Sequence, residues 1–239
     1  MLKPGGNTMG HEQFTWVSVI PGLSRLAPHV ANGIIVSVVL IVLVVLGYLQ
    51  LRRTAEEVIP AEKMTFRNFV EILVEMVLGL VDSTMGPYGR KFMLIIGTLG
   101  IFILFNNLSG LIPGFEPATS NVNTTFACSL TVFVLTHYYG VRQHGFGYLK
   151  RFVGPIWWLA PIMIPIEIIG HISRPLSLGL RLFGNMMGDH LVTGIFFMLI
   201  PLAVPLVGML LGTFVAFVQA YVFVLLSMTY FSGAIAEEH

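Results

Sequence analysis

The sequence predicts an all-α integral membrane protein. Of its 239 residues, 55% are hydrophobic and only 10% are charged, whereas soluble domains carry about 25% charged residues. Several apolar stretches reach the roughly 20 residues that a helix needs to cross the hydrocarbon core of a bilayer. We expect about five membrane-crossing helices plus one amphipathic interfacial helix, with the last two helices long and strongly tilted as a hairpin.

Composition also limits the possible functions. The net charge is +1, so no basic surface indicates nucleic-acid binding. Cys128 is the only cysteine, which excludes an intrachain disulfide and a cysteine metal cluster. The chain contains no HExxH helix, GxSxG elbow, phosphate loop or carboxylate-rich cage. We therefore expect no metal, no cofactor, no direct nucleotide binding and no catalysis of the kind that soluble enzymes perform.

The first third of the chain divides into three segments. Residues 1–32 are mixed in character and form an N-terminal segment before the first span. Residues 33–51 contain no charge and form the first transmembrane helix. Residues 64–86 form an amphipathic helix that lies in the interface or against other spans. Its polar face carries Asn68, Glu71, Glu75, Gly79 and Asp82, at helical spacings of three and four.

Residues 92–112 and 123–140 form a transmembrane helical hairpin. Asn106 and Asn107 near the end of the first of these helices allow two interpretations. They either mark the end of the helix or line an aqueous entrance.

The last helical hairpin, residues 156–231, is expected to carry the functional site. As a single helix, residues 156–199 would be about 66 Å long at 1.5 Å per residue, so the helix must tilt or kink. The alternative makes residues 171–190 a loop outside the membrane and leaves too few residues before it for a comfortable span. We favour the single helix, with the reversal at Pro201 and Pro205.

The distribution of basic residues predicts the orientation. Linkers 52–91 and 141–155 hold nine lysines and arginines, and the loop 113–122 holds none. The positive-inside rule places the two basic linkers in the cytoplasm. The N-terminus is then outside and the C-terminus cytoplasmic.

A polar stripe runs along the penultimate helix. Glu167, Arg174 and Arg181 are spaced by seven residues and share one face. A guanidinium cannot lose its proton, and an arginine at the centre of a membrane helix costs about 2.5–3.5 kcal/mol on insertion scales. Arg181 is therefore a functional candidate, and the alternative is a structural ion pair with Glu167 or Asp189. Neighbouring turns add His171, Ser177, Asn185, Gly188 and His190, of which the histidines could also be ordinary hydrogen-bonded interior residues.

Small residues flank this stripe and recur on the last helix. Gly184 and Gly188 have the GxxxG spacing that lets another helix approach closely. Gln219 lies beside the small residues of the last helix, and a buried amide needs hydrogen-bond partners such as Arg181 or water. The small residues repeat every four positions, and packing of the last two helices alone would also explain them: Gly208, Gly212, Ala216 and Ala220.

At PLSLGLRLFGN (175–185) the chain resembles subunit a of F-type ATP synthases. The resemblance extends to Gln219 in QAYVFVLLSMTYFSGA, to NLSGLIPGFEP (107–117) and to NVNTT (121–125). It implies that Arg181 faces an essential carboxylate on a rotating ring of c subunits and that Gln219 lies close to it.

The resemblance also implies further site residues. His190 matches a position that lines a half-channel, and Asp189, which replaces a usually small residue, is expected to take over part of the proton relay. Gly212 stands where some members have a histidine, and Gly110 where some have an acid. Other matching positions belong to the two aqueous paths: Glu167, Ser177, Asn185 and Asn107.

The function implied is the stator subunit of a rotary ATP synthase in the bacterial inner membrane. Two offset half-channels and Arg181 would couple proton flow through the c-ring to ATP synthesis. The implied partners are the c-ring subunits, the peripheral-stalk b subunits and membrane lipid. A rotor-independent ion channel or transporter subunit and a membrane scaffold are the alternatives. Co-isolation with a ring of small two-helix subunits would support the stator, and uncoupled flux through the chain alone in liposomes would support the channel. A scaffold would tolerate neutralisation of Arg181.

Overall fold

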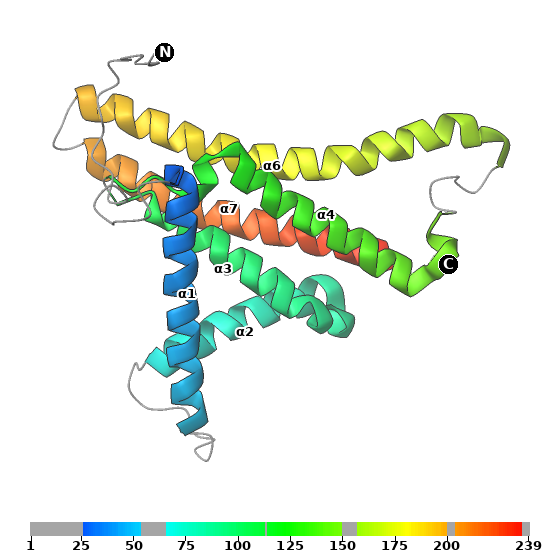
Figure 1. Cartoon of the computed structure of the whole chain (residues 1–239), viewed down its shortest axis with the longest axis horizontal. Helices are drawn as coiled ribbons and strands as arrows, with labels where there is room; N and C mark the ends of the chain where they lie inside the picture. The colour runs from blue at the N-terminus through cyan, green and yellow to red at the C-terminus, as the bar shows by residue number, and fades with distance from the viewer. Residues whose placement is uncertain (1–25, 54–65, 113, 150–156, 200–203, 236–239) are drawn as a thin grey trace, which may run out of the picture.

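The computed structural model describes residues 26–53, 66–112, 114–149, 157–199 and 204–235 (Figure 1). Regular secondary structure in these ranges is helical throughout. The predicted N-terminal segment 1–32 therefore lies mostly outside the described residues. The elements are α1 (Pro28–Arg53), α2 (Phe66–Met85), η3 (Gly86–Phe92), α3 (Met93–Ser109), η4 (Ala118–Ser120), α4 (Val122–His144), η5 (Gly145–Leu149), η6 (Trp157–Leu159), α6 (Ala160–Leu199) and α7 (Val204–Ile235).

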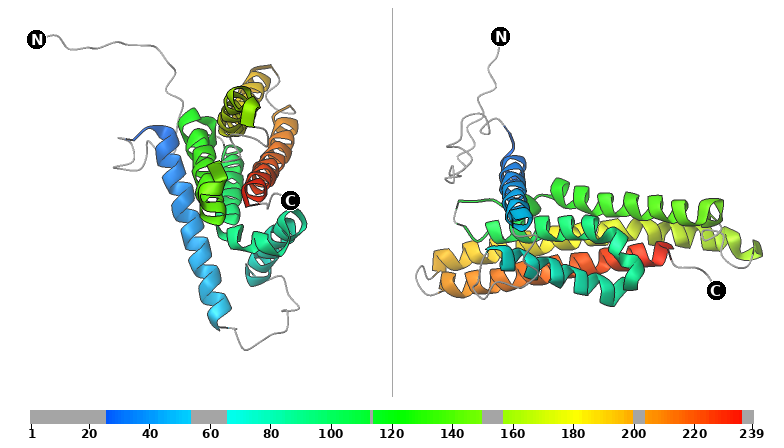
Figure 2. Two further views of the ribbon diagram at one scale, coloured as in Figure 1. Left: turned by 90° about the vertical axis from the view of Figure 1, so that its right-hand side faces the viewer. Right: turned by 90° about the horizontal axis from the view of Figure 1, so that it is seen from below.

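Helix α6 is a single helix of 40 residues, about 60 Å long at 1.5 Å per residue. Residues 171–190 are helical throughout, so the alternative with a loop at this place is wrong. Pro165 and Pro175 lie inside α6, and each removes one backbone hydrogen bond. The helix nevertheless continues through both prolines and runs alongside α7 (Figures 1 and 2).

The core lies between the ends of α2 and α3 and the helices α4, α6 and α7. Its largest fully buried side chains include Phe92, Ile103, Leu182 and Phe231. The rings of Phe92 and Phe231 stack with their centroids 4.9 Å apart. This packing fixes α7 against the start of α3 and so holds the long hairpin in place.

Helix α1 stands apart from this core and runs across the direction of α6 and α7 (Figure 1). Large apolar side chains such as Ile41 and Val44 are more than 60% exposed on it. Its first turns are different, because Ala31 and Asn32 are 0% and 1% exposed. Helix α1 is therefore anchored near its N-terminal end, and its remaining surface suits contact with lipid.

Helix α2 is followed directly by η3 and α3. The Arg90 guanidinium donates two hydrogen bonds to the Asp82 carboxylate, from Nε at 3.0 Å and from Nη2 at 2.8 Å. Gly86 has φ +65°, a conformation that suits glycine at the end of a helix. The polar pair and the glycine together fix the angle between α2 and α3.

Three helical stretches among the described residues are long and apolar enough to cross a membrane: Pro28–Gln50, Asn68–Ser109 and Val207–Ile235. The chain is thus a multi-pass, all-helical membrane protein. Helices α4 and α6 carry more polar residues and are not among the three. The count of about five spans, the interfacial position of residues 64–86 and the tilt of the last hairpin stay predictions.

Candidate functional site

Arg181 lies on an open face of α6. Its side chain is exposed, and so is that of Ser177 one turn earlier. A Cβ atom added to Gly184 or Gly188 would meet no atom within 4 Å. The two glycines therefore do not serve packing between the helices described here. They leave room beside the guanidinium for another molecule.

Arg181 forms no ion pair or hydrogen bond with any residue that the structure describes. The structural ion pair with Glu167 or Asp189, which the sequence left open, is not formed in the described part of the chain. Glu167 instead pairs with His171, Oε1 to Nε2 at 3.1 Å, one turn along α6. The charge of Arg181 thus has no described counter-ion within its own chain.

One turn after Arg181, α6 and α7 are joined through two amides. Asn185 Nδ2 donates a hydrogen bond of 2.5 Å to Gln219 Oε1. Gln219 is only 2% exposed, and its Nε2 is buried with no hydrogen-bond partner among the described residues. The requirement that Gln219 find a partner is met by Asn185 rather than by Arg181.

Asp189 follows one further turn along α6, and its carboxylate lies against Gly212 of α7. A Cβ atom at position 212 would be 2.8 Å from Asp189 Oδ2 and 3.2 Å from Oδ1. Such distances are too short for an ordinary contact, so the missing side chain of Gly212 makes room for the carboxylate. Leu111 borders the same space, since its Cδ2 atom would lie 3.1 Å from a Cβ atom at position 212.

The small residues of α7 continue this contact with α6 and its neighbours. Gly208 and Gly212 are buried, and Ala216 and Ala220 are 0% and 6% exposed. The predicted stripe of small residues is therefore covered within the chain, in contrast to Gly184 and Gly188. His190 belongs to α6, but its side chain lies outside the described part of the structure.

A second polar group gathers at the other end of α6. Glu167 is 14 residues before Arg181, about 21 Å along the helix axis. The ring of its partner His171 lies 5.0 Å from the ring of His137 on α4. From the sequence alone, the position of His137 near the cytoplasmic edge favours an ordinary residue, although an ionisable side chain within a membrane helix is a signal for function.

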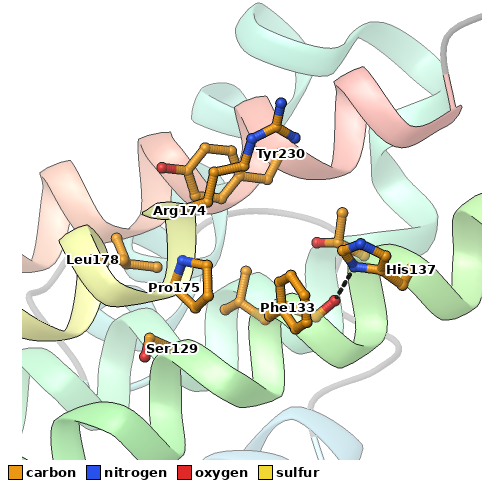
Figure 3. Close-up of a pocket in the computed structure, with 9 residues that line it drawn as sticks. Ser129, Phe133, His137, Arg174, Pro175, Leu178 and Tyr230 are labelled. Atoms are coloured by element: carbon orange, nitrogen blue, oxygen red, sulfur yellow. Dashed lines mark hydrogen bonds between the residues drawn. The ribbon is translucent and has the colours of Figure 1, made fainter. Parts of the chain in front are cut away.

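Figure 3 shows the neighbourhood of this group, between α4, α6 and α7. Arg174 lies over the ring of Tyr230, 5.7 Å from its centroid. His137 Nδ1 is 2.8 Å from the carbonyl oxygen of Phe133. These side chains surround a cavity of about 10 Å³, which is roughly the space that one buried water molecule needs. Pro175, which removes one backbone hydrogen bond of α6, lines it as well.

Asn107 lies on α3, toward the end of the bundle where α6 ends and α7 begins. It is 3% exposed, and its Oδ1 accepts a hydrogen bond of 2.8 Å from Thr119 Oγ1. Its Nδ2 is buried with no hydrogen-bond partner among the described residues. The predicted site residues Arg181, Asn185 and Asp189 lie within about two turns of α6, and Gln219 of α7 is bonded to Asn185. Glu167 lies further along α6, and Asn107 lies on α3.

No group of three or more histidine, cysteine, aspartate or glutamate side chains in the described ranges is placed to hold a metal ion. The predicted absence of a resident cofactor is not tested by this observation. The two polar groups along α6 contain carboxylates, imidazoles and amides, together with the guanidinium groups of Arg174 and Arg181.

The family model described as ATP synthase A chain matches residues 33–232. The chain is 52% identical to "ATP synthase subunit a" of Trichlorobacter lovleyi over 87% of this chain and 89% of that protein. It is 57% identical to "ATP synthase subunit a 1" of Syntrophotalea carbinolica over 72% of this chain and 74% of that protein. With "ATP synthase subunit a" of Geobacter sulfurreducens it shares 52% identity, over 77% of this chain and 81% of that protein.

Proposed function

Because the chain belongs to the ATP synthase subunit a family, we propose that it is the stator subunit through which protons reach and leave a rotating c-ring. The observation that carries this proposal is the position of Arg181. It is a permanent cation with no described counter-ion, on a helix face that small residues leave open.

A carboxylate on a neighbouring rotor is the partner that such a cation suits. A neutral carboxylic acid can pass through lipid, but its anion has a large desolvation cost there. Next to Arg181 the ionised form is stabilised, so each ring carboxyl gives up its proton as it passes and takes up another before it returns to lipid. The same positive charge repels a proton that would cross directly between the two paths.

Two offset aqueous paths then force ion flow to turn the ring. Asn107, Asp189, His190 and Gln219 would serve the outer path, because they lie toward the end of α6 that the orientation rule places outside. Asn185 would hold Gln219 in place. The cytoplasmic path would pass Ser177 and Glu167. Each elementary charge that crosses releases about 2.3 kcal/mol per 100 mV, so several protons must pass for each ATP.

Membership in this family places the chain in an ATP synthase complex. We propose that its direct contacts are the c-ring, at the open face around Arg181, and the peripheral-stalk b subunits. The proposed location is the bacterial inner membrane, with the N-terminus outside and the C-terminus cytoplasmic.

Replacement of Arg181 tests the proposal. We expect Arg181→Ala and Arg181→Lys to lose proton-coupled ATP synthesis in membrane vesicles, because lysine is a point charge that does not reproduce the planar guanidinium. Arg142→Ala is a matched control, since Arg142 is exposed in the last turn of α4. Retained coupling in both Arg181 variants would contradict the assigned role. Ion flux through the chain alone in liposomes would favour a rotor-independent channel instead.

A further inference from the structure

Arg174 is the second arginine of α6, and it has no part in the function proposed above. It precedes Arg181 by seven residues, so the two side chains share one helix face and lie about 10 Å apart along the axis. Among the residues that the structure describes, Arg174 forms no ion pair and no hydrogen bond. This face of α6 therefore carries two permanent cations without a described counter-ion.

The groups around Arg174 do not neutralise it. Glu167, two turns earlier on the same stripe, is paired with His171 at 3.1 Å. The ring of His171 in turn lies 5.0 Å from that of His137 on α4. Glu167 is the only carboxylate in this neighbourhood of the described chain, and its partner is His171. The charged and titratable groups near Arg174 come from three helices: Glu167, His171 and Arg181 on α6, His137 on α4 and Tyr230 on α7.

The ring of Tyr230 holds the guanidinium in place without cancelling its charge. Arg174 lies over this ring, 5.7 Å from its centroid (Figure 3). The face of an aromatic ring carries partial negative charge and attracts a cation within about 6 Å, but it does not form an ion pair with it. Because Tyr230 belongs to α7, the contact also ties the position of Arg174 to the second helix of the long hairpin.

The open face around Arg181 extends back along α6 to Arg174. A Cβ atom at Gly170, one turn before Arg174, would meet no atom within 4 Å. Ser173 and Ser177, on either side of Arg174, are small and exposed. Small residues let another helix approach closely, so a helix that approaches Arg181 can also approach Arg174.

The spacing of the two arginines matches the spacing of neighbouring subunits in a ring. Packed helices lie about 8–10 Å apart, so equivalent carboxyl groups on adjacent ring subunits are separated by roughly the same distance. Seven residues of α6 also span about 10 Å. With α6 tilted along the ring, as predicted, one cation would face each of two successive carboxyl groups.

We propose that Arg174 is a second fixed cation of the rotor interface, which faces the ionised carboxylate of one ring subunit while Arg181 faces that of its neighbour. Tyr230 acts as a positioning residue that keeps the guanidinium on the open face. The proposed orientation places the start of α6 towards the cytoplasm, so Arg174 would act where ring carboxyl groups exchange protons with the cytoplasmic path. This inference rests on the proposed function and adds a residue to its mechanism.

The pH profile of ATP-driven proton pumping tests this role. The whole complex is assayed in inverted membrane vesicles, whose medium faces the cytoplasmic path. In this direction each ring carboxylate takes up a proton from the medium, so the pumping rate falls at high pH, along the alkaline limb of the profile. Without the cation at position 174, the ring carboxyl group keeps its proton to higher pH.

We expect Arg174→Gln to move the alkaline limb upward by about one pH unit. Arg174→Lys retains the charge and should restore the original limb. Arg142→Gln is the matched control, because it removes an exposed arginine in the last turn of α4, and it should leave the limb in place.

An unmoved alkaline limb in Arg174→Gln would overturn the inference. So would an equal loss of pumping at every pH in Arg174→Gln and Arg174→Lys, because a purely structural role predicts that result. The amount of chain in the membrane is measured in parallel, and Arg174→Met serves as a second variant where Arg174→Gln lowers it.

Two further comparisons assign the shift to the ring. His171 also lies within the field of Arg174, so Arg174→Gln is repeated in a His171→Gln background, and a shift that disappears there would overturn the inference. Tyr230→Leu should move the limb in the same direction by a smaller amount. An unmoved limb in that variant would remove the positioning role of Tyr230.

Arg181→Ala separates this inference from the proposed function. Lost coupling in that variant, together with an unmoved limb in Arg174→Gln, would remove the second cation and leave the stator role. Retained coupling in Arg181→Ala would contradict the stator role itself, and with it the basis of the second cation.

Discussion

The side-chain amide of Asn185 on α6 donates a hydrogen bond of 2.5 Å to the amide oxygen of Gln219 on α7. This contact lies one turn from Arg181 and joins the two helices of the long hairpin. Gln219 is buried at 2% exposure, and few other partners are available to it. The contact therefore fixes both the distance between the helices and the orientation of Gln219.

Loss of this contact should weaken both stability and transport. Asn185→Leu leaves the oxygen of Gln219 buried without a donor, which typically costs about 1–3 kcal/mol. We expect a lower thermal stability of the purified complex and slower ATP-driven proton pumping. Met187→Leu, at an exposed position on the same helix, should change neither. Wild-type pumping by Asn185→Leu would show that the orientation of Gln219 does not matter for transport.

The contact between Asp189 and Gly212 gives a second prediction. Gly212→Ala places a Cβ atom 2.8 Å from Asp189 Oδ2, so the carboxylate must move. We expect slower proton pumping at normal assembly, and we expect Gly212→Ala to have little further effect in an Asp189→Gly background. The comparison of single and double variants isolates the interaction.

A glycine in open space provides the control for this prediction. A Cβ atom at Gly79 of α2 would meet no atom within 4 Å, so Gly79→Ala should leave pumping unchanged. If Gly212→Ala were equally harmless, the space at position 212 would have no role in holding Asp189. If its effect persisted in full without Asp189, the cause would lie elsewhere in the packing of α7.

Much of the helical architecture could be predicted from the sequence, because apolar stretches of membrane length leave few choices. The continuous helix α6 could be predicted because a loop at 171–190 would leave too few residues before it for a membrane span. The helix bears the cost of Pro165 and Pro175 inside it. The polar stripe of Glu167, Arg174 and Arg181 on α6 could also be predicted, since residues seven apart share a helix face. These features depend on local sequence and on the bilayer.

The contacts between helices could not be predicted in the same way. Arg181 was an expected partner for Gln219, but Asn185, one turn further along α6, donates the hydrogen bond to it instead. The pairing of His171 with His137 and the position of Asn32 beneath residues 114–121 join segments far apart in the chain. A single sequence carries no direct signal for such contacts, although polar residues within apolar helices mark where to look.

The open face around Arg181 gives the last prediction. A Cβ atom at position 188 would meet no atom of the described chain within 4 Å, so we expect Gly188→Leu to fold and enter the membrane normally. Leucine there would fill the space that the proposed ring needs, because close approach of helices depends on small residues. We therefore expect normal amounts of the chain in membranes, but lost proton pumping and weaker co-purification with c subunits.

Gly194→Leu serves as the control, because it adds the same side chain to α6 at another glycine with open space around it. Position 194 lies 13 residues after Arg181, about 20 Å along the helix axis, so this variant should retain more of its pumping. A Gly188→Leu complex that pumps protons at the normal rate would mean that no helix approaches this face. Arg181 would then need a partner other than the ring, because its own chain offers none among the residues described.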